Sequence, residues 1–257
     1  MNAIFVTVRT GSTRLPNKAK IKINGKRTIQ RVVDRMKNSK FCDSIVLCTT
    51  EREEDDWLCE LARDSGICFY RGSSEDKLER WNGACKEFSV DYFVTADGDD
   101  LFCEPKLIDK AFSQFADAES DVPIEFIKSD GIICGAFTYG IKRSALEKVC
   151  EIKDSSDTEM MWVYFTETGI FNVSELENVD RRFYRDDIRM TLDYKNDLHF
   201  FESVIEYYEK QGVYDYCLED IVDLIDKKPE LAKINIHLQE EWKKNQDRKT
   251  TLSIREE

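Results

Sequence analysis

The chain has 257 residues and carries 38 Lys and Arg against 51 Asp and Glu, a formal net charge of −13. Such an acidic surface would repel a phosphate backbone, which excludes most nucleic-acid binders. No apolar run is long enough to span a bilayer, and the N-terminus enters a strand-like segment without the basic-then-apolar pattern of a signal peptide, so we expect a cytoplasmic protein with no membrane partner.

The first half of the chain alternates between strand and helix patterns. β-branched apolar runs predict strands over 3–8, 44–50, 67–71 and 91–96. Helical stripes and terminal signals predict helices over 28–40, 51–66 and 74–88. This alternation predicts an α/β fold of three layers, in which a mostly parallel central sheet has helices on both faces.

The second half continues the pattern less regularly. We expect helices over 106–117, from Ser144 and over 195–212, and strands near 123–127, within 131–141 and over 187–193. Residues 158–169 suit either a helix or a lid. No linker is visible, so we predict a single domain over 1–240. The charged C-terminal extension 241–257 lacks an apolar face and is expected to fray.

Cysteine usage agrees with a reducing compartment. The nine cysteines are scattered singly, with no C-x-x-C pair, and most lie in apolar surroundings. We therefore expect reduced core residues, and neither a disulfide framework nor a zinc site.

A basic loop follows the first predicted strand. Residues 1–33 contain eight Lys and Arg and no Asp or Glu. Gly11 and Ser12 permit a tight turn with inward backbone N–H groups, and Arg14 and Lys18 supply charge. This loop suits a nucleoside triphosphate with Mg²⁺, although a basic loop can also be plain solvated surface. The loop fits neither the dinucleotide-binding motif nor the P-loop.

Two carboxylates far apart in sequence are candidate Mg²⁺ ligands. Asp99 follows the strand 91–96 and Asp193 ends the predicted strand 187–193, so both belong at the carboxyl edge of the sheet. Mg²⁺ prefers one or two carboxylates together with substrate phosphates. Asp193 could equally be an N-cap of the next helix. Asp97 and Asp100 are interpreted as solvated or supporting carboxylates.

An arginine cluster precedes Asp193, and its members are Arg181, Arg182, Arg185 and Arg189. These guanidinium groups could bind the carboxylate or phosphate of a second substrate, an acceptor, and we assign Arg185 and Arg189 to that role. Salt bridges with Asp180, Asp186 and Asp187 are an equally good explanation.

Several motifs together resemble one known family. The string R-x-G-S-x-R-L-P-x-K spans 9–18, I-N-G-K spans 23–26, RGSSEDKLER spans 71–80, DGDDLFCEP spans 97–105 and RMTLDYKNDL spans 189–198. They resemble the SpsF-like cytidylyltransferases, relatives of the CMP-ulosonate and CMP-acylneuraminate synthetases. Asn17 stands where that family usually has Gly, a change that the tolerance of Asn for a left-handed backbone accommodates.

The resemblance implies a Rossmann-type fold like that of the nucleotide-diphospho-sugar transferases. It also implies transfer of CMP from CTP to an acceptor oxygen, with release of pyrophosphate, in surface polysaccharide or glycoconjugate precursor synthesis. Arg14 and Lys18 match the phosphate-holding pair, and Asp99 and Asp193 match the metal positions; these four are the predicted catalytic residues. The remaining nucleotide-binding matches are Arg9, Gly11, Ser12, Arg71, Ser73 and Asp76.

Alternatives remain open at this point. Asp97-Gly98-Asp99 also spells the D-x-D signature of metal-dependent glycosyltransferases, and a silent nucleotide-binding relative is a second possibility. The acceptor is either an acidic sugar or a phosphorylated or phosphonate small molecule. Related synthetases commonly dimerise, so we expect a homodimer with the aromatic segment 160–165 as a buried contact.

Overall fold

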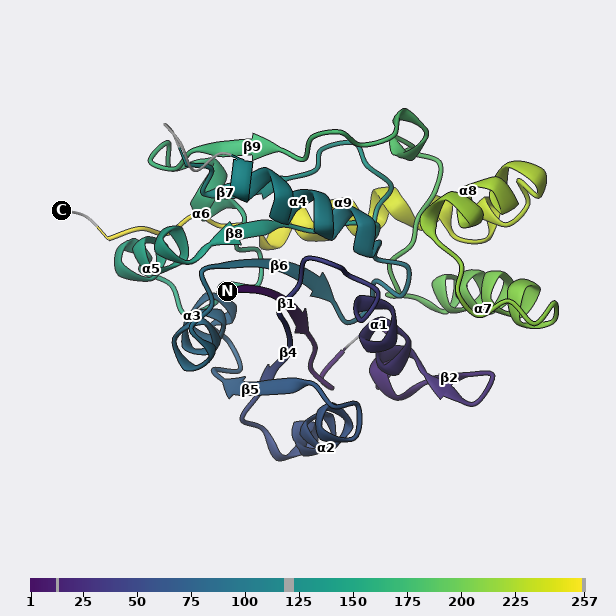
Figure 1. Ribbon diagram of the computed structural model, residues 1–257, viewed down its shortest axis with the longest axis horizontal. Helices are drawn as coiled ribbons and strands as arrows, with labels where there is room; N and C mark the ends of the chain where they lie inside the picture. The colour runs from purple at the N-terminus through teal and green to yellow at the C-terminus, as the bar shows by residue number, and fades with distance from the viewer. Residues whose placement is uncertain (13, 118–122, 256–257) are drawn as a thin grey trace.

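The computed structural model describes residues 1–12, 14–117 and 123–255, and its centre is a β-sheet (Figure 1). The strands are β1 Asn2–Thr7, β2 Lys22–Ile23, β3 Lys26–Arg27, β4 Ser44–Thr50, β5 Cys68–Gly72, β6 Tyr92–Asp97, β7 Phe126–Lys128, β8 Gly140–Lys142 and β9 Val173–Glu175. The helices are α1 Thr28–Met36, α2 Asp56–Asp64, α3 Lys77–Phe88, α4 Pro105–Asp117, α5 Arg143–Ile152, α6 Val163–Thr166, α7 Lys195–Glu209, α8 Leu218–Lys227 and α9 Gln239–Lys249.

Within the described residues the main sheet has seven strands in the order β5-β4-β1-β6-β8-β7-β9, and β2 and β3 form a separate hairpin. β1 pairs in parallel with both β4 and β6, and β4 pairs in parallel with β5. β8 runs antiparallel to both of its neighbours, β6 and β7. The predicted mostly parallel sheet is confirmed.

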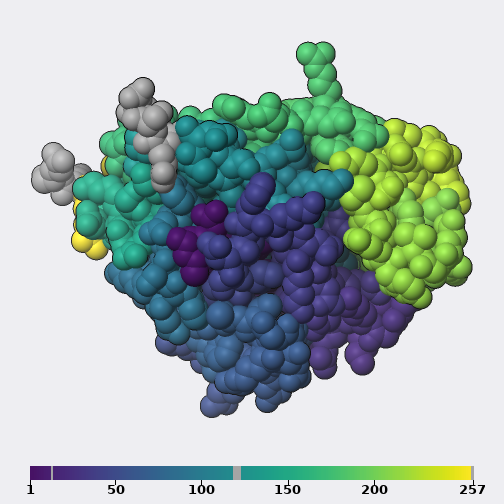
Figure 2. All heavy atoms as spheres, viewed as in Figure 1, coloured from purple at the N-terminus to yellow at the C-terminus, as the bar shows by residue number. Residues whose placement is uncertain are grey.

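Successive residues of β1 point to opposite faces of the sheet, as the pleat requires. Ile4 and Val6 belong to one core, which packs against α1, α2, α4, α7 and α8. Ala3 and Phe5 belong to a second core, which packs against α3, α5 and α6. Helices therefore cover both faces, as predicted. Figure 2 shows α7 and α8 as a lobe at one edge of the molecule.

Residues 187–193, expected to form a strand, make one isolated bridge with the rest of the described chain, between Cys134 and Arg189. At Gly135 the backbone has φ +87°, and a Cβ there would lie 2.1 Å from the Met190 carbonyl oxygen. This left-handed turn directs the segment 131–136 away from residues 187–193, so pairing between the two segments ends after one bridge. The strand predicted within 131–141 is likewise shorter than expected, because only the end of this range belongs to a strand, β8.

The aromatic segment 160–165 lies inside the chain. Met161, Val163, Tyr164 and Phe165 are each 1% exposed or less and pack in the second core. These four side chains are thus unavailable for contact with another subunit, whereas Met160 and Trp162 are half-buried, so a subunit contact through this segment stays a prediction. Homodimer formation itself stays a prediction.

Residues 241–255 of the predicted C-terminal extension pack against the rest of the chain and are not frayed. It forms α9, whose Trp242 ring lies 5.2 Å from the Arg189 guanidinium carbon. Beyond the helix, Ile254 bridges Lys153 and Leu252 packs against the second core. Polar and cation–π contacts replace the apolar face that the sequence lacks. The division at residue 240 stays a prediction.

All nine cysteines are free thiols; four of them are buried, and the other five are half-buried rather than core residues. Among the described residues, no helix combines the length and the apolar character that crossing a membrane requires.

Candidate active site

The loop after β1 is anchored by its polar groups. The backbone N–H of Thr10 donates to Asp55 Oδ1 at 2.7 Å, and the indole of Trp57 donates to the Thr10 hydroxyl at 3.1 Å. Asn17 adopts the predicted left-handed conformation with φ 57°. The Thr28 hydroxyl donates to the Lys18 carbonyl at 2.6 Å, so the loop is fixed at both ends.

The four predicted catalytic side chains meet at the carboxyl edge of the sheet. Lys18 Nζ lies 2.5 Å from Asp99 Oδ2 and 3.0 Å from Asp193 Oδ1. Arg14 Nη2 lies 2.7 Å from the same oxygen of Asp193. The Asp193 side chain is only 2% exposed, whereas Arg14 is 30% exposed, so this group has a buried end and an accessible one.

The charged side chains of these four residues shift one another's pKa values, because they are largely buried and water screens them little. Burial would raise the pKa of Asp193, but Lys18 and Arg14 hold it below its ordinary value. Burial also raises the pKa of Asp99. Lys18 acts to lower this pKa, but the negative charges of Asp193 and Asp97 act to raise it, and it stays above its ordinary value. Burial would lower the pKa of Lys18, but Asp99 and Asp193 raise it above its usual value. Lys18 therefore stays charged between two carboxylates.

A second, fully buried network holds Asp193 in place. Arg189 is 0% exposed; its Nη2 lies 3.3 Å from Asp193 Oδ2 and its Nε lies 3.0 Å from Asp197 Oδ1. Asp197 also accepts the backbone N–H of Asp193 at 2.9 Å, and Asn235 Nδ2 donates to Asp197 Oδ1 at 2.9 Å. Sequence reasoning missed Asp197 and Asn235, which bear on the site through Arg189, Asp193 and Tyr194.

Three neighbouring carboxylates at the end of β6 could hold a metal ion. Asp97, Asp99 and Asp100 each offer an oxygen, and these atoms lie within 4.8 Å of one another. Gly98 makes this approach possible, because a Cβ there would lie 2.8 Å from Val8 Cβ. An oxygen-only donor set of this kind suits a hard divalent cation such as Mg²⁺. In the sequence, the run D-G-D-D over 97–100 is the pattern that indicates these three carboxylates.

Two arginines matched to nucleotide binding, Arg9 and Arg71, contact backbone carbonyls near the ends of β4 and β5. Arg9 Nη1 donates to the Ser74 carbonyl at 3.0 Å, next to Ser73. Arg71 donates to the carbonyls of Thr50 and Arg52, each at 3.0 Å. Their part in binding nucleotide stays a prediction.

Asp76 lies largely buried at the start of α3. It accepts the N–H of Glu79 and the hydroxyl of Thr158, and it pairs with Lys153. Ser73 accepts the Asp76 N–H at 3.0 Å. The turn 73–76 is therefore tied to the 153–158 segment.

Gly11 and Ser12 lie in the anchored loop after β1, where the Ser12 N–H donates to the Thr10 carbonyl at 2.8 Å.

The arginine cluster divides into exposed and buried members. Arg185 pairs with Asp187 at 2.6 Å and with Asp226 of α8 at 2.9 Å, and Arg182 pairs with Asp180 and Asp223. Arg189 lies beneath Asp193. The structure thus does not bring Arg185 and Arg189 together, and acceptor binding by either stays a prediction.

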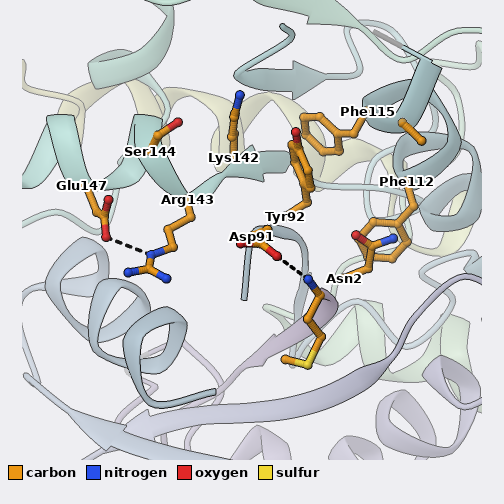
Figure 3. A pocket seen from close by; sticks show the side chains of 11 residues that line it. Asn2, Asp91, Tyr92, Phe112, Phe115, Lys142, Arg143, Ser144 and Glu147 are labelled. Atoms are coloured by element: carbon orange, nitrogen blue, oxygen red, sulfur yellow. Dashed lines mark hydrogen bonds and ion pairs between the residues drawn. The ribbon is translucent and has the colours of Figure 1, made fainter. Parts of the chain in front are cut away.

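A pocket of about 560 Å³ lies at the opposite edge of the sheet, beside the starts of β1 and β6 (Figure 3). Four of its charged groups pair with one another, Asp91 with the N-terminal amine and Arg143 with Glu147 at 2.8 Å, whereas Lys142 lies over the Tyr92 ring. In open α/β sheets ligands bind at the carboxyl ends of strands, so we place the active site at the Lys18 end.

Comparison with known proteins identifies the relatives of this chain. Residues 3–221 match the model of a family described as cytidylyltransferase. The spore coat polysaccharide biosynthesis protein SpsF of Bacillus subtilis is 26% identical, over 90% of this chain and 98% of its own length. The 3-deoxy-manno-octulosonate cytidylyltransferase of Pelobacter propionicus is 28% identical over 116 residues, covering 45% of this chain and 44% of its own.

The fold is shared with a solved structure. A cytidylyltransferase from Leptospira borgpetersenii superposes with a TM-score of 0.80 and is 26% identical, covering 90% of this chain and 96% of that one. The comparison extends well beyond the β1 loop, because it includes both the first, regular half of the sheet and the irregular second half.

Proposed function

Because the chain belongs to the cytidylyltransferase family and is a CTP-dependent nucleotidyltransferase, we propose that it transfers CMP to an acceptor oxygen of an acidic sugar or of a phosphorylated or phosphonate small molecule. The observation that carries the proposal is the meeting of Arg14 and Lys18 with Asp99 and Asp193 at the carboxyl edge of the sheet. A nucleotidyltransferase needs cations for the triphosphate and carboxylates for a metal within reach of each other.

In the proposed reaction the acceptor oxygen attacks the α-phosphorus of CTP. The new O–P bond forms as the bond from the α-phosphorus to the bridging oxygen of the β-phosphate breaks. Pyrophosphate leaves, and the proton of the acceptor hydroxyl passes to solvent. Negative charge grows on the leaving pyrophosphate, and positioned cations stabilise it.

Arg14 and Lys18 take the phosphate-binding role. In the free chain both contact Asp193, so binding requires them to exchange carboxylate oxygens for phosphate oxygens. Arg14 is 30% exposed and can turn outward, whereas Lys18 is 17% exposed and stays near Asp99. Arg189 keeps Asp193 in position meanwhile, because its guanidinium contacts the other oxygen of that carboxylate.

We propose that Asp99 and Asp193 hold Mg²⁺, with Asp97 and Asp100 close enough to assist. A bound Mg²⁺ would offset the negative charge of the triphosphate and align it for displacement. Burial raises the pKa of Asp100 well above its usual range, and Asp99 and Asp97 add to the rise. An added cation would relieve this crowding of negative charge.

The acidic sugar is the favoured acceptor class. It is supported by the relative whose name includes 3-deoxy-manno-octulosonate, a sugar acid, and by the relative named for polysaccharide biosynthesis. We propose surface polysaccharide or glycoconjugate precursor synthesis as the setting, with a cytoplasmic homodimer as the acting form. Because the chain belongs to the cytidylyltransferase family, we reject the glycosyltransferase interpretation of Asp97-Gly98-Asp99.

A thermal-shift comparison tests the nucleotide half without knowledge of the acceptor. CTP, UTP, ATP and GTP are each added with and without Mg²⁺. A ligand at about 100 times its dissociation constant stabilises the native state by about 2.7 kcal/mol. We expect the largest shift for CTP with Mg²⁺. Equal shifts for all four nucleotides would contradict a cytidine-specific site.

The acceptor half is tested by pyrophosphate release. The chain is incubated with CTP, Mg²⁺ and a panel of sugar acids, sugar phosphates, phosphonates and neutral sugars. We expect release with at least one sugar acid and none with neutral sugars. A preference for phosphonates or phosphates would redirect the acceptor class, and the absence of release with every compound would favour a silent nucleotide-binding protein.

A further inference from the structure

Lys77 is a cation at the carboxyl edge of the sheet to which no role has yet been assigned. It is the first residue of α3 and directly follows the turn 73–76. Its Nζ lies 3.3 Å from Oδ1 of Asp97, the last residue of β6. The Lys77 side chain is 11% exposed, so its charge is largely shielded from water although it contacts a carboxylate of the proposed metal site.

The aliphatic part of Lys77 is held in place by Trp81. Trp81 follows four residues later in α3, and residues at this spacing lie on the same face of a helix. The Trp81 side chain is fully buried, and Lys77 Nζ lies 4.9 Å from the centre of its ring. The indole N–H donates to the hydroxyl of Thr7, the last residue of β1, at 2.9 Å. Lys77 is therefore fixed beside the ends of both β1 and β6.

The sheet changes its winding direction between β1 and β6. The two strands are neighbours, with Thr7 opposite Asp97, but β4 and β5 lie on the β1 side and β8, β7 and β9 lie on the β6 side. In open α/β sheets the crevice at such a switch point is the usual ligand site. Because Asp97 ends β6, the Lys77 ammonium group lies at this point, and the topology places it there independently of any matched motif.

Two lysines approach the carboxylates at the end of β6 from different elements. Lys18 comes from the loop after β1 and pairs with Asp99, whereas Lys77 comes from the turn 73–76 and pairs with Asp97. A nucleotide with its β- and γ-phosphates against Lys18 and its nucleoside against this turn has its α-phosphate between the two. The α-phosphate then lies on the Lys77 side of the carboxylates.

The contacts of Arg9, another cation beside the turn, differ from those of Lys77. Arg9 Nη1 donates to the Ser74 carbonyl at 3.0 Å and Nη2 lies 3.1 Å from Glu159 Oε2, so its guanidinium already joins the turn to the segment after α5. The 3.3 Å contact of Lys77 with Asp97 is longer than the about 2.7–2.9 Å that is typical of a charged hydrogen bond. Lys77 can therefore exchange this carboxylate for a phosphate oxygen at little cost.

We propose that Lys77 is a further catalytic residue, whose ammonium group donates to a non-bridging oxygen of the α-phosphate of CTP. The proposal rests on the proposed function, because it assigns this residue to the same reaction. The α-phosphorus is the atom that the acceptor oxygen attacks, and its negatively charged oxygens repel that attack. A positioned cation offsets this charge while Lys77 keeps its proton and forms no covalent bond.

Binding of cytidine, CMP and CTP tests the role of Lys77 without knowledge of the acceptor. Each ligand is titrated by calorimetry into the chain without Mg²⁺, so that changes at the carboxylates do not act through a bound metal. CMP carries the α-phosphate alone and cytidine carries none. The ratio of their affinities therefore reports the contacts of the α-phosphate.

Lys77→Met is the first variant, because it removes the charge and keeps an unbranched side chain against Trp81. We expect CMP to bind about tenfold or more weakly, as for loss of a hydrogen bond to a charged group, and the affinity for cytidine to change less than about twofold. Lys77→Gln, measured in parallel, should show the same pattern. Lys86→Met is the matched control, since Lys86 is exposed in the last turn of α3, and both affinities should stay unchanged.

Asp97→Asn separates phosphate binding from simple neutralisation of Asp97. In Lys77→Met the unpaired Asp97 carboxylate would itself repel a phosphate, and this repulsion is absent when Asp97→Asn is combined with it. We expect the double variant to bind CMP about tenfold or more weakly than Asp97→Asn alone. Equal CMP affinity of these two variants overturns the proposal, because Lys77 would then act only on Asp97.

Unchanged CMP affinity in Lys77→Met also overturns the proposal, and so does an equal loss for CMP and cytidine, which would indicate a purely structural role. CTP binding to the unaltered chain, repeated with Mg²⁺, reports the proposed function separately. A lack of CTP binding rejects the nucleotide assignment, whereas normal CTP binding with CMP affinity unaffected by Lys77→Met rejects only the role of Lys77. Urea unfolding confirms that each variant is folded.

Discussion

The loop 9–18 and the segment 180–189 are both rich in cations, yet their cations have opposite surroundings. In the loop, Lys18 finds its carboxylates on Asp99 and Asp193, which are 81 and 175 residues away. In the segment 180–189, Arg182 pairs with Asp180 and Arg185 with Asp187, each two residues away. The arginines with an acid beside them in sequence pair with that acid and with one exposed carboxylate of α8, whereas Lys18, which has no acid nearby in sequence, pairs with carboxylates that are largely buried and distant in sequence.

Arg189 is the member of the segment 180–189 that departs from this rule. It is 0% exposed and pairs with Asp193 and Asp197, which follow it across the turn into α7. The difference between Arg185 and Arg189 is therefore one of burial, and burial decides how much an ion pair matters.

Arg189→Ala should have the largest effect on stability. It leaves Asp193 and Asp197 buried without their guanidinium partner, and breaking a buried ion pair in this way costs about 3–5 kcal/mol. Urea unfolding measures the change in the free energy of unfolding. A change below about 1 kcal/mol, the range of an exposed pair, would mean that Arg189 does not support Asp193.

Asp99→Asn should have the largest effect on turnover. It removes a carboxylate that contacts Lys18 and belongs to the proposed metal site, and loss of one such stabilising group lowers kcat by about 10²–10³-fold. The fold should persist, because the change also relieves the repulsion between Asp99 and its acidic neighbours. Pyrophosphate release at increasing Mg²⁺ measures the loss.

Asp187→Asn is the matched control for that variant, because Asp187 is 56% exposed and pairs only within the arginine-rich segment. Its turnover should equal that of the unaltered chain. Full activity of Asp99→Asn, or an equal loss in both variants, would remove Asp99 from the proposed metal site.

Lys18→Ala should weaken CTP binding by about 1.5–3 kcal/mol, the range for a hydrogen bond to a charged group. Calorimetric titration of CTP with Mg²⁺ measures it. Lys22→Ala is the control, since Lys22 is an exposed residue of β2 in the same basic stretch. Equal CTP affinity of the two variants would show that the loop acts through its overall charge and not through Lys18.

Arg185→Ala should have the smallest effect on stability, below about 1 kcal/mol, because its partners are exposed carboxylates. Urea unfolding, in parallel with Arg189→Ala, measures it. A loss as large as that of Arg189→Ala would mean that exposure does not separate the two arginines. Assaying both variants at several acceptor concentrations also tests their predicted part in acceptor binding.

Much of the first half of the fold could be predicted because its signals are local. The run 44–50 is apolar and β-branched and forms β4 over the same residues. The stripe of Ile29, Val32, Val33 and Met36 becomes the buried face of α1. Asn17 takes the left-handed backbone that its side chain tolerates. Each of these depends on a residue and its near neighbours.

Predictions failed where partners distant in sequence decide the structure. Residues 187–193 look like a strand because Ile188, Met190 and Leu192 alternate with other residues, but within the described part of the chain their one β-bridge joins Cys134 and Arg189. The charged tail forms α9 because Arg189 and Tyr194 offer contacts that its own sequence does not reveal. Glu159 lies 150 residues from Arg9, and nothing near it in sequence indicates that pair.

The sequence by itself determined the α/β class, the basic loop and the residue types that cytidylyl transfer requires. Periodicity and charge bias are properties of short stretches of sequence, so they can be recognised without knowledge of the fold. Only the tertiary structure decided which charges are paired, which are buried and which face one another. Those outcomes depend on distance and on exclusion of water, and the chain sets both only when its distant segments pack together.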